Sequence, residues 1–179
     1  MRNKKVLFIT QAALIAAIYV ALTYVSASFN LASGSVQMRL SETLCILPVF
    51  TPAAIPGLAI GCLLANLLTG SLIWDVIFGS LATLLGAIGT YLLRKHKFLC
   101  TIPPVLSNCI IVPFVLIYAY HIPEVLFHGV NVTYWFTALT VGIGEVITIC
   151  VLGSVLMRAL NKYRFQIFRN LEDNGSLGK

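Results

Sequence analysis

Six apolar segments, separated by short polar turns, occupy most of this chain of 179 residues. Hydrophobic residues make up 59% of the chain and charged residues only 10%. A soluble domain of this length would need far more polar residues to cover its surface. Because a helix needs about 20 apolar residues to cross a bilayer, the sequence predicts an all-α integral membrane protein. We expect residues 1–179 to form a single domain, a bundle of six transmembrane helices with a short basic tail at about 161–179.

The turns between the apolar segments define the six predicted helices. The second segment is short, so a half-helix or a re-entrant segment is an alternative to a full span. The first segment has a basic start like that of a signal peptide, but it is longer than the roughly 7 to 15 apolar residues of a signal sequence. We therefore expect an uncleaved first helix. The predicted helices run from Val6 to Ser26, from Leu40 to Phe50, from the turn bracketed by Pro52 and Pro56 to about Thr69, from Trp74 to Leu93, from Phe98 to Tyr120 and from Val132 to about Leu160.

Basic residues predict the orientation of the bundle. Basic loops stay in the cytoplasm, and eleven of the twelve Lys and Arg residues fall on one side of the predicted topology. Both termini are then cytoplasmic, which requires an even number of spans and agrees with six. The eleven residues are Arg2, Lys4, Lys5, Arg94, Lys95, Lys97, Arg158, Lys162, Arg164, Arg169 and Lys179.

Several function classes lack support in the sequence. The net charge of +6 is explained by the topology and calls for no nucleic-acid partner. The chain has no GxxxxGK[ST] phosphate loop, no HExxH, no GxSxG and no Cys/His metal cluster, so we expect neither an enzyme nor a bound cofactor or metal. The five cysteines contain no CxxC pair and all lie in apolar segments, where we expect small buried hydrophobes. They are Cys45, Cys62, Cys100, Cys109 and Cys150.

Small residues recur at intervals of three or four in three of the predicted helices. In the first helix Ala13, Ala17 and Ala21 form a smooth stripe, which lets another helix approach closely. On spacing alone, this stripe is equally consistent with docking of a partner and with packing inside the bundle. The stripes of the third and fourth helices are interpreted as internal packing, and they consist of Gly57, Gly61, Ala65 and Thr69, and of Gly79, Ala82 and Gly86.

Ionisable residues in spanning helices are the strongest functional signal. Each costs about 2.5–3.5 kcal/mol on insertion scales. Glu42 and Asp75 lie toward the outer side, and Glu145 lies deeper. The alternatives are a satisfied interhelical hydrogen bond for Glu145 and an interfacial pair for Arg39 with Glu42. A small outward-facing pocket lined by carboxylates suits the capture of a small polar molecule.

Four stretches in order give the chain a resemblance to a known family. They are VQMRLSETL, PGLAIGCLLANLLTG, DVIFGSLATLLGA and a Gly-Glu pair in the last span. The chain resembles, from about Val6 to Leu160, the queuosine-precursor transporter (QueT-like) family of substrate-binding (S) components of energy-coupling factor (ECF) transporters. The resemblance implies a six-helix bundle in a bacterial cell membrane and a 7-deazaguanine substrate. It also implies two kinds of partner, a transmembrane coupling subunit and a pair of ATPases, and it favours docking as the role of the alanine stripe.

The resemblance and the residue types together suggest how the pocket works. The loop from Ala27 to Met38 is expected to act as a lid over it. We expect Glu145 to accept the two donors of the guanine edge and Glu42 or Asp75 to meet the amine of an aminomethyl substituent. Arg39 would neutralise Glu42 or close the pocket. Aromatic side chains would form a wall for the flat ring, although they are also typical interfacial anchors. The candidate substrate-binding residues are Gln37, Arg39, Glu42, Asn66, Trp74, Asp75, Asn108, Tyr134 and Glu145.

Two other functions stay open at this point. One is an S component for another vitamin, and the other is a different class of protein, a stand-alone carrier or an undetected membrane enzyme. Copurification with ATPase subunits distinguishes an S component of either kind from a carrier or an enzyme. A ligand-binding screen distinguishes an S component for a queuosine precursor from one for another vitamin.

Overall fold

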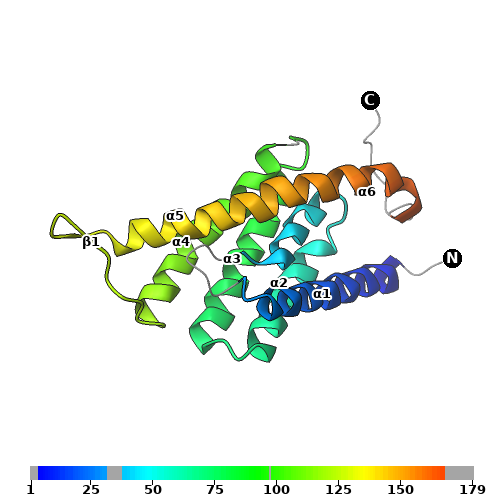
Figure 1. Ribbon diagram of the computed structural model, residues 1–179. Coiled ribbons are helices and arrows are strands. Elements are labelled where there is room, and N and C mark those ends of the chain that lie inside the picture. The colour runs from blue at the N-terminus through cyan, green and yellow to red at the C-terminus, as the bar shows by residue number, and fades with distance from the viewer. Residues whose placement is uncertain (1–3, 32–37, 97, 168–179) are drawn as a thin grey trace.

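The computed structural model describes residues 4–31, 38–96 and 98–167. In this part of the chain nearly all regular structure is helical (Figure 1). The elements are α1 (Lys4–Ser28), the 3₁₀ helix η1 (Leu40–Val49), α2 (Ala54–Leu68), α3 (Ile73–Leu92), the short 3₁₀ turn η2 (Leu99–Thr101), α4 (Ile102–Tyr118), β1 (Leu126–Phe127), β2 (Val130–Asn131), α5 (Thr133–Glu145), the π-helical segment η3 (Val146–Leu152) and α6 (Gly153–Ile167).

The six predicted helices are confirmed, and four of them are long and apolar enough to cross a membrane. The last of these runs without a break through α5, η3 and α6. Two predicted helices, η1 and α2, are apolar but shorter. The four candidate spans are Lys4–Ser28, Ile73–Leu92, Leu99–Tyr118 and Thr133–Tyr163.

The short second segment is a buried 3₁₀ helix. At a rise of about 2 Å per residue, its 10 residues cover about 20 Å, less than the apolar thickness of a bilayer. Neighbouring helices enclose it and bind its backbone and side chains. The Ser26 hydroxyl accepts a hydrogen bond from the Leu40 amide at 2.8 Å, and the Thr43 hydroxyl donates to the Thr148 carbonyl at 3.2 Å. Short, tightly wound backbone is tolerated at membrane depth when protein surrounds it.

Close packing of α1 against α2 depends on glycine. A Cβ atom at Gly57 would lie 2.8 Å from the Ala12 carbonyl oxygen, and one at Gly61 would lie 2.8 Å from Cβ of Tyr19. On α3, a Cβ at Gly86 would clash with Pro104 of α4. Gly57, Gly61 and Gly86 thus serve internal packing, as predicted for these stripes, whereas Thr69 at the end of the first stripe is exposed.

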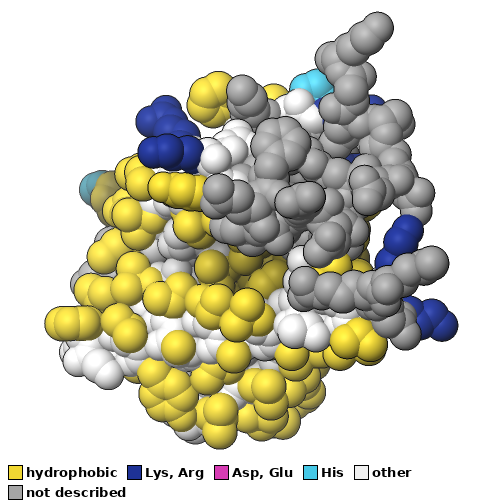
Figure 2. Space-filling model, turned by 90° about the vertical axis from the view of Figure 1, so that its right-hand side faces the viewer, with side chains coloured by type: hydrophobic (Ala, Val, Ile, Leu, Met, Phe, Trp, Pro, Cys, Tyr) yellow, Lys and Arg dark blue, Asp and Glu magenta, His cyan; other side chains and the backbone are white. Residues whose placement is uncertain are grey.

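The arrangement of the helix ends follows the distribution of basic residues. In Figure 1 the start of α1 and the end of α6 lie on the same side of the bundle, and the hairpin of β1 and β2 lies on the opposite side. Figure 2 looks onto the side of the two terminal helix ends and shows Lys and Arg side chains at the edge of a largely hydrophobic surface. The described helices therefore fit a topology with both termini on one face of the membrane.

The hairpin before α5 was not predicted. His128 and Gly129 form its two-residue turn, and both have a positive φ, 49° and 80°. This is the geometry of a type I′ turn, which matches the twist of the two strands. It is a small addition to the predicted all-α fold.

The cysteines follow the prediction in part. Among the described residues the five cysteines form no disulfide; Cys45, Cys62 and Cys100 are buried, and the other two are half-buried. Cys45 is more than a small hydrophobe, because its thiol contacts an acidic side chain described below.

Candidate ligand-binding site

Two adjoining polar chambers lie among η1, α2, α3, α4 and α5. The outer chamber has a volume of about 380 Å³, and the inner chamber holds only about 20 Å³. Arg39 and Val112 line both chambers and so stand between them. The outer chamber is lined mainly by Thr23, Ser26, Asn66, Thr69, Ser71, Asp75 and Tyr120, and the inner one by Glu42, Gly79, Thr83, Asn108, Val141 and Glu145.

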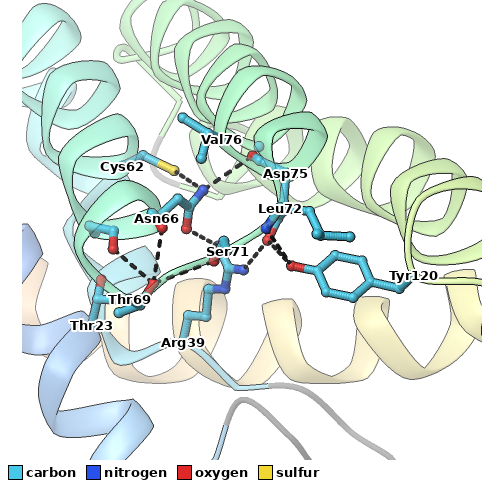
Figure 3. Close-up of polar contacts among 12 residues, drawn as sticks. Thr23, Arg39, Cys62, Asn66, Thr69, Ser71, Leu72, Asp75, Val76 and Tyr120 are labelled. Carbon is cyan, nitrogen blue, oxygen red and sulfur yellow. Dashed lines mark hydrogen bonds and ion pairs between the residues drawn. The ribbon is translucent and has the colours of Figure 1, made fainter.

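Arg39 connects η1 to α2 and α3 (Figure 3). Its Nη1 donates to Oδ1 of Asn66 at 3.2 Å, and its Nη2 lies 3.3 Å from Oδ2 of Asp75 in an ion pair. Asn66 in turn donates to the Asp75 backbone carbonyl at 3.2 Å. Arg39 was expected to neutralise Glu42 or to close the pocket; its ion pair in the structure is with Asp75, and closure of the pocket stays a prediction. Arg39 precedes η1 in an extended conformation and reaches across to α3, whereas Glu42, in the first turn of η1, faces α1.

Glu42 is held by neutral donors. The Tyr19 hydroxyl, on α1, donates a hydrogen bond to Oε1 of Glu42, and the Cys45 thiol lies 3.0 Å from Oε2. Tyr19 is only 1% exposed and Glu42 only 2% exposed. Both carboxylate oxygens of this buried acid therefore have a partner within the protein.

Glu145 lies at the end of α5, where the helix passes into the π-helical segment η3. Its side chain is 8% exposed and lines the inner chamber with Asn108. Among the residues that the structure describes, Oε2 of Glu145 has no hydrogen-bond partner. A π-helical insertion changes the direction in which following side chains point, and such insertions are common at functional sites.

The structure brings six of the nine candidate substrate-binding residues together around the two chambers. They are Arg39, Glu42, Asn66, Asp75, Asn108 and Glu145. Gln37 and half of the predicted lid loop, residues 32–37, lie outside the described residues. Their predicted roles stay predictions.

The two aromatic candidates lie elsewhere. Trp74 stacks on Phe78, with ring centroids 6.0 Å apart, in an apolar groove of about 630 Å³ between α3 and α4. The Tyr134 ring is 4.8 Å from that of Phe114. Neither lines a polar chamber, because both side chains project from the outer surface of the bundle, where aromatic anchors are common.

Two tyrosine hydroxyl groups that contact the acids of the site were not predicted. The Tyr120 hydroxyl lies 3.4 Å from Oδ2 of Asp75, and it accepts a hydrogen bond from the Leu72 amide at 3.3 Å. Tyr120 could have been predicted as a site residue, because it lies at the outer end of the fifth predicted helix, at the same level as Asp75. The other is Tyr19, which looked like a core aromatic because apolar residues surround it in the sequence.

The charges of the two chambers do not balance. Three acidic side chains, Glu42, Asp75 and Glu145, surround one cation, Arg39. Buried charges are stable when they are paired and hydrogen-bonded. The arrangement suits a small polar molecule that brings hydrogen-bond donors or positive charge.

A second, apolar groove lies on the outer surface of α1 and α2. Ala12 and Ala16 lie against α2, and together with the exposed Ala13 and Ala17 they line a groove of about 480 Å³ that α2 completes with Ile60 and Leu64. Ala21 is also exposed. The stripe is therefore accessible from outside the bundle, as a docking role requires.

The fold and the site define a multi-pass membrane protein with a small, acid-lined pocket, an arrangement that suits a small polar molecule. A family model described as "QueT transporter" matches residues 9–162, and the chain belongs to this family. The predicted resemblance is thus confirmed, and the family is one of transporters and not of enzymes.

One relative is informative about the substrate. The chain is 35% identical over 99 residues to "Queuosine precursor transporter QueT" of Lactococcus lactis subsp. cremoris (strain MG1363). The match covers 54% of this chain and 57% of the relative, so it spans little more than half the length of each. No solved structure matches the chain.

Proposed function

We propose that this protein is the S component of an ECF-type importer and that it captures a queuosine precursor, a 7-deazaguanine, from outside the cell. The buried acid cluster around Arg39 carries the proposal. A 7-deazaguanine offers several N–H donors and a carbonyl acceptor on a flat ring, and the outer chamber offers carboxylate, amide, hydroxyl and guanidinium partners. Its volume of about 380 Å³ is ample for a bicyclic base. Family membership and the name of the relative support the substrate class.

The orientation belongs to the same proposal. With the basic helix ends in the cytoplasm, the turn between α2 and α3 and its neighbour Asp75 lie toward the outside, so that the outer chamber opens to the substrate. Cysteines introduced at Asn3 and Gly175, in a background without the native cysteines, should resist impermeant thiol reagents in intact cells. Labelling of either from outside would overturn the orientation.

Partner docking is assigned to the alanine groove of α1. The coupling subunit would place a helix against Ala13, Ala17 and Ala21, where small side chains allow close approach. A pair of ATPases bound to that subunit would supply the energy for release into the cell. Affinity purification from a cell that expresses the coupling and ATPase subunits should recover all of them with the protein.

Calorimetry on the purified protein tests the substrate. We expect at least one of three compounds to bind: 7-aminomethyl-7-deazaguanine, its nitrile precursor or queuine. The variant Asp75→Asn, which leaves Arg39 without its ion-pair partner, should weaken binding by about 2–5 kcal/mol. The matched control is Glu124→Gln, at an exposed position outside the chambers. Binding of a vitamin and of none of the three bases would favour an S component for another substrate, and recovery without ATPases would favour a stand-alone carrier.

A further inference from the structure

Glu145 differs from the other acids of the site in having a free oxygen. Within residues 4–31, 38–96 and 98–167, its Oε2 is the one buried side-chain nitrogen or oxygen without a hydrogen-bond partner. Buried polar atoms in native proteins are nearly always paired, so an exception calls for an explanation. A ligand that donates a hydrogen bond to this atom is such an explanation.

The other two acids are already occupied. Asp75 pairs with Arg39 and lies 3.4 Å from the Tyr120 hydroxyl. Glu42 accepts a hydrogen bond from the Tyr19 hydroxyl and contacts the Cys45 thiol. In the inner chamber, which Glu42 and Glu145 line and Asp75 does not, a donor on the ligand therefore finds its open acceptor at Glu145.

The size of the inner chamber limits what can reach that acceptor. About 20 Å³ is room for one group of the size of a water molecule. A terminal amine fits this space, and the edge of a fused ring, which presents two donors side by side, does not. The ring finds its space in the outer chamber, on the other side of Arg39.

We propose that the inner chamber is a subsite for a protonated primary amine carried by a ligand whose ring occupies the outer chamber. The inference rests on the proposed function and narrows its substrate class. An ammonium group donates to Oε2 of Glu145 and, as a second cation beside Arg39, offsets the surplus of acids. Among queuosine precursors the aminomethyl form carries such a group. A nitrile carries only an acceptor and places it against a carboxylate oxygen.

This assignment changes the role expected for Glu145. The sequence suggested the guanine edge as its partner and left the amine to Glu42 or Asp75. One free oxygen beside a water-sized space favours the amine at Glu145. The guanine edge then faces the amide and hydroxyl groups of the outer chamber.

Calorimetry with three bases and two proteins tests the subsite. The bases are 7-aminomethyl-7-deazaguanine, 7-cyano-7-deazaguanine and 7-deazaguanine without a substituent. The proteins are the wild type and Glu145→Gln, which keeps the size of the side chain and removes its charge. We expect the wild type to bind the aminomethyl base about 30-fold or more tightly than the nitrile, as for a buried charged hydrogen bond. In Glu145→Gln that preference should fall to within about threefold, with nitrile affinity unchanged or improved.

Other outcomes separate failure of the subsite from failure of the proposed function. Equal affinity of the wild type for all three bases would overturn the amine subsite and leave the substrate class intact. An equal loss for every base in Glu145→Gln would assign this acid to the guanine edge, as first expected. Binding of none of the bases would contradict the proposed function itself. Glu124→Gln controls for loss of a carboxylate elsewhere.

Discussion

The two faces of α1 differ in chemistry and in what they contact. The inner face carries Tyr19, Thr23 and Ser26, all buried, and each is hydrogen-bonded to a residue of the first turn of η1. The outer face carries the exposed alanines of the stripe and contributes no hydrogen bond to the chambers. One helix thus positions the polar chambers on one side and offers a smooth surface on the other. Mutations on the two faces should therefore separate ligand binding from transport.

Of the variants on α1, the one that fills the outer face should have the largest effect on transport. Ala17→Trp places an indole in the groove of about 480 Å³ and prevents close approach of a partner helix. Transport should fall by more than about tenfold, the effect of about 1.4 kcal/mol of weakened docking. Ligand affinity of the isolated protein, measured by calorimetry, should stay within about twofold of wild type, a change below about 0.5 kcal/mol.

Leu14→Trp is the control for the outer face. Leu14 is also exposed on α1 but does not line the groove, so transport should stay near the wild-type rate. If Ala17→Trp reduced affinity and transport together, the stripe would serve the internal packing of the bundle, and the distinction between the two faces would not hold.

The next effect, on the free energy of unfolding and on ligand affinity, is expected on the inner face, at Tyr19. Tyr19→Phe removes the donor to Oε1 of Glu42 and leaves a buried carboxylate oxygen without a partner. Such a loss costs about 1–3 kcal/mol. The free energy of unfolding in detergent should fall by this amount. Ligand affinity should fall as well, because Glu42 lines the inner chamber.

Tyr24→Phe is the matched control for Tyr19. The Tyr24 hydroxyl also donates from α1, at 3.1 Å to the Leu68 carbonyl, but at an exposed position. Water can replace its partner, so stability and affinity should change little. Equal effects of the two substitutions would mean that the bond to Glu42 has no special role.

The sequence predicted the helices better than their polar contacts. Apolar run length and the asymmetry of basic residues gave six helices, because the bilayer requires both. The glycines of the stripes of α2 and α3 were assigned correctly to packing, since a Cβ at Gly57 or Gly61 would collide with α1 and one at Gly86 would collide with α4. The 3₁₀ form of η1 was not predictable, because its backbone depends on partners such as Ser26 and Thr148 in distant helices.

The composition of the site was predictable, and its pairing was not. Acids in spanning segments are costly wherever they lie, so Glu42, Asp75 and Glu145 could be selected without a structure. Which of these acids pairs with Arg39 depends on tertiary packing, because Arg39 and Asp75 are 36 residues apart in the chain. Trp74 was a candidate for the aromatic wall of the pocket, but aromatic residues at helix ends are as typical of lipid contacts as of pockets, and the sequence does not distinguish the two.

The smallest expected effect lies at Thr23, between the other two contacts of the inner face. Its hydroxyl lies 2.9 Å from the Tyr19 carbonyl and 3.0 Å from Oγ of Ser41 in η1. Thr23→Val keeps the shape of the side chain and removes both bonds, which should lower the free energy of unfolding by about 1 kcal/mol. Thr10→Val is the matched control, because Thr10 makes the same bond to the carbonyl four residues earlier, at 2.8 Å, but is exposed and has no partner in η1 among the described contacts. If denaturant unfolding in detergent gave the two variants the same stability, the contact with η1 would contribute nothing measurable. If Thr23→Val alone loses stability while ligand affinity stays within about threefold, Thr23 holds η1 against α1 and Tyr19 alone connects α1 to the acids of the chamber.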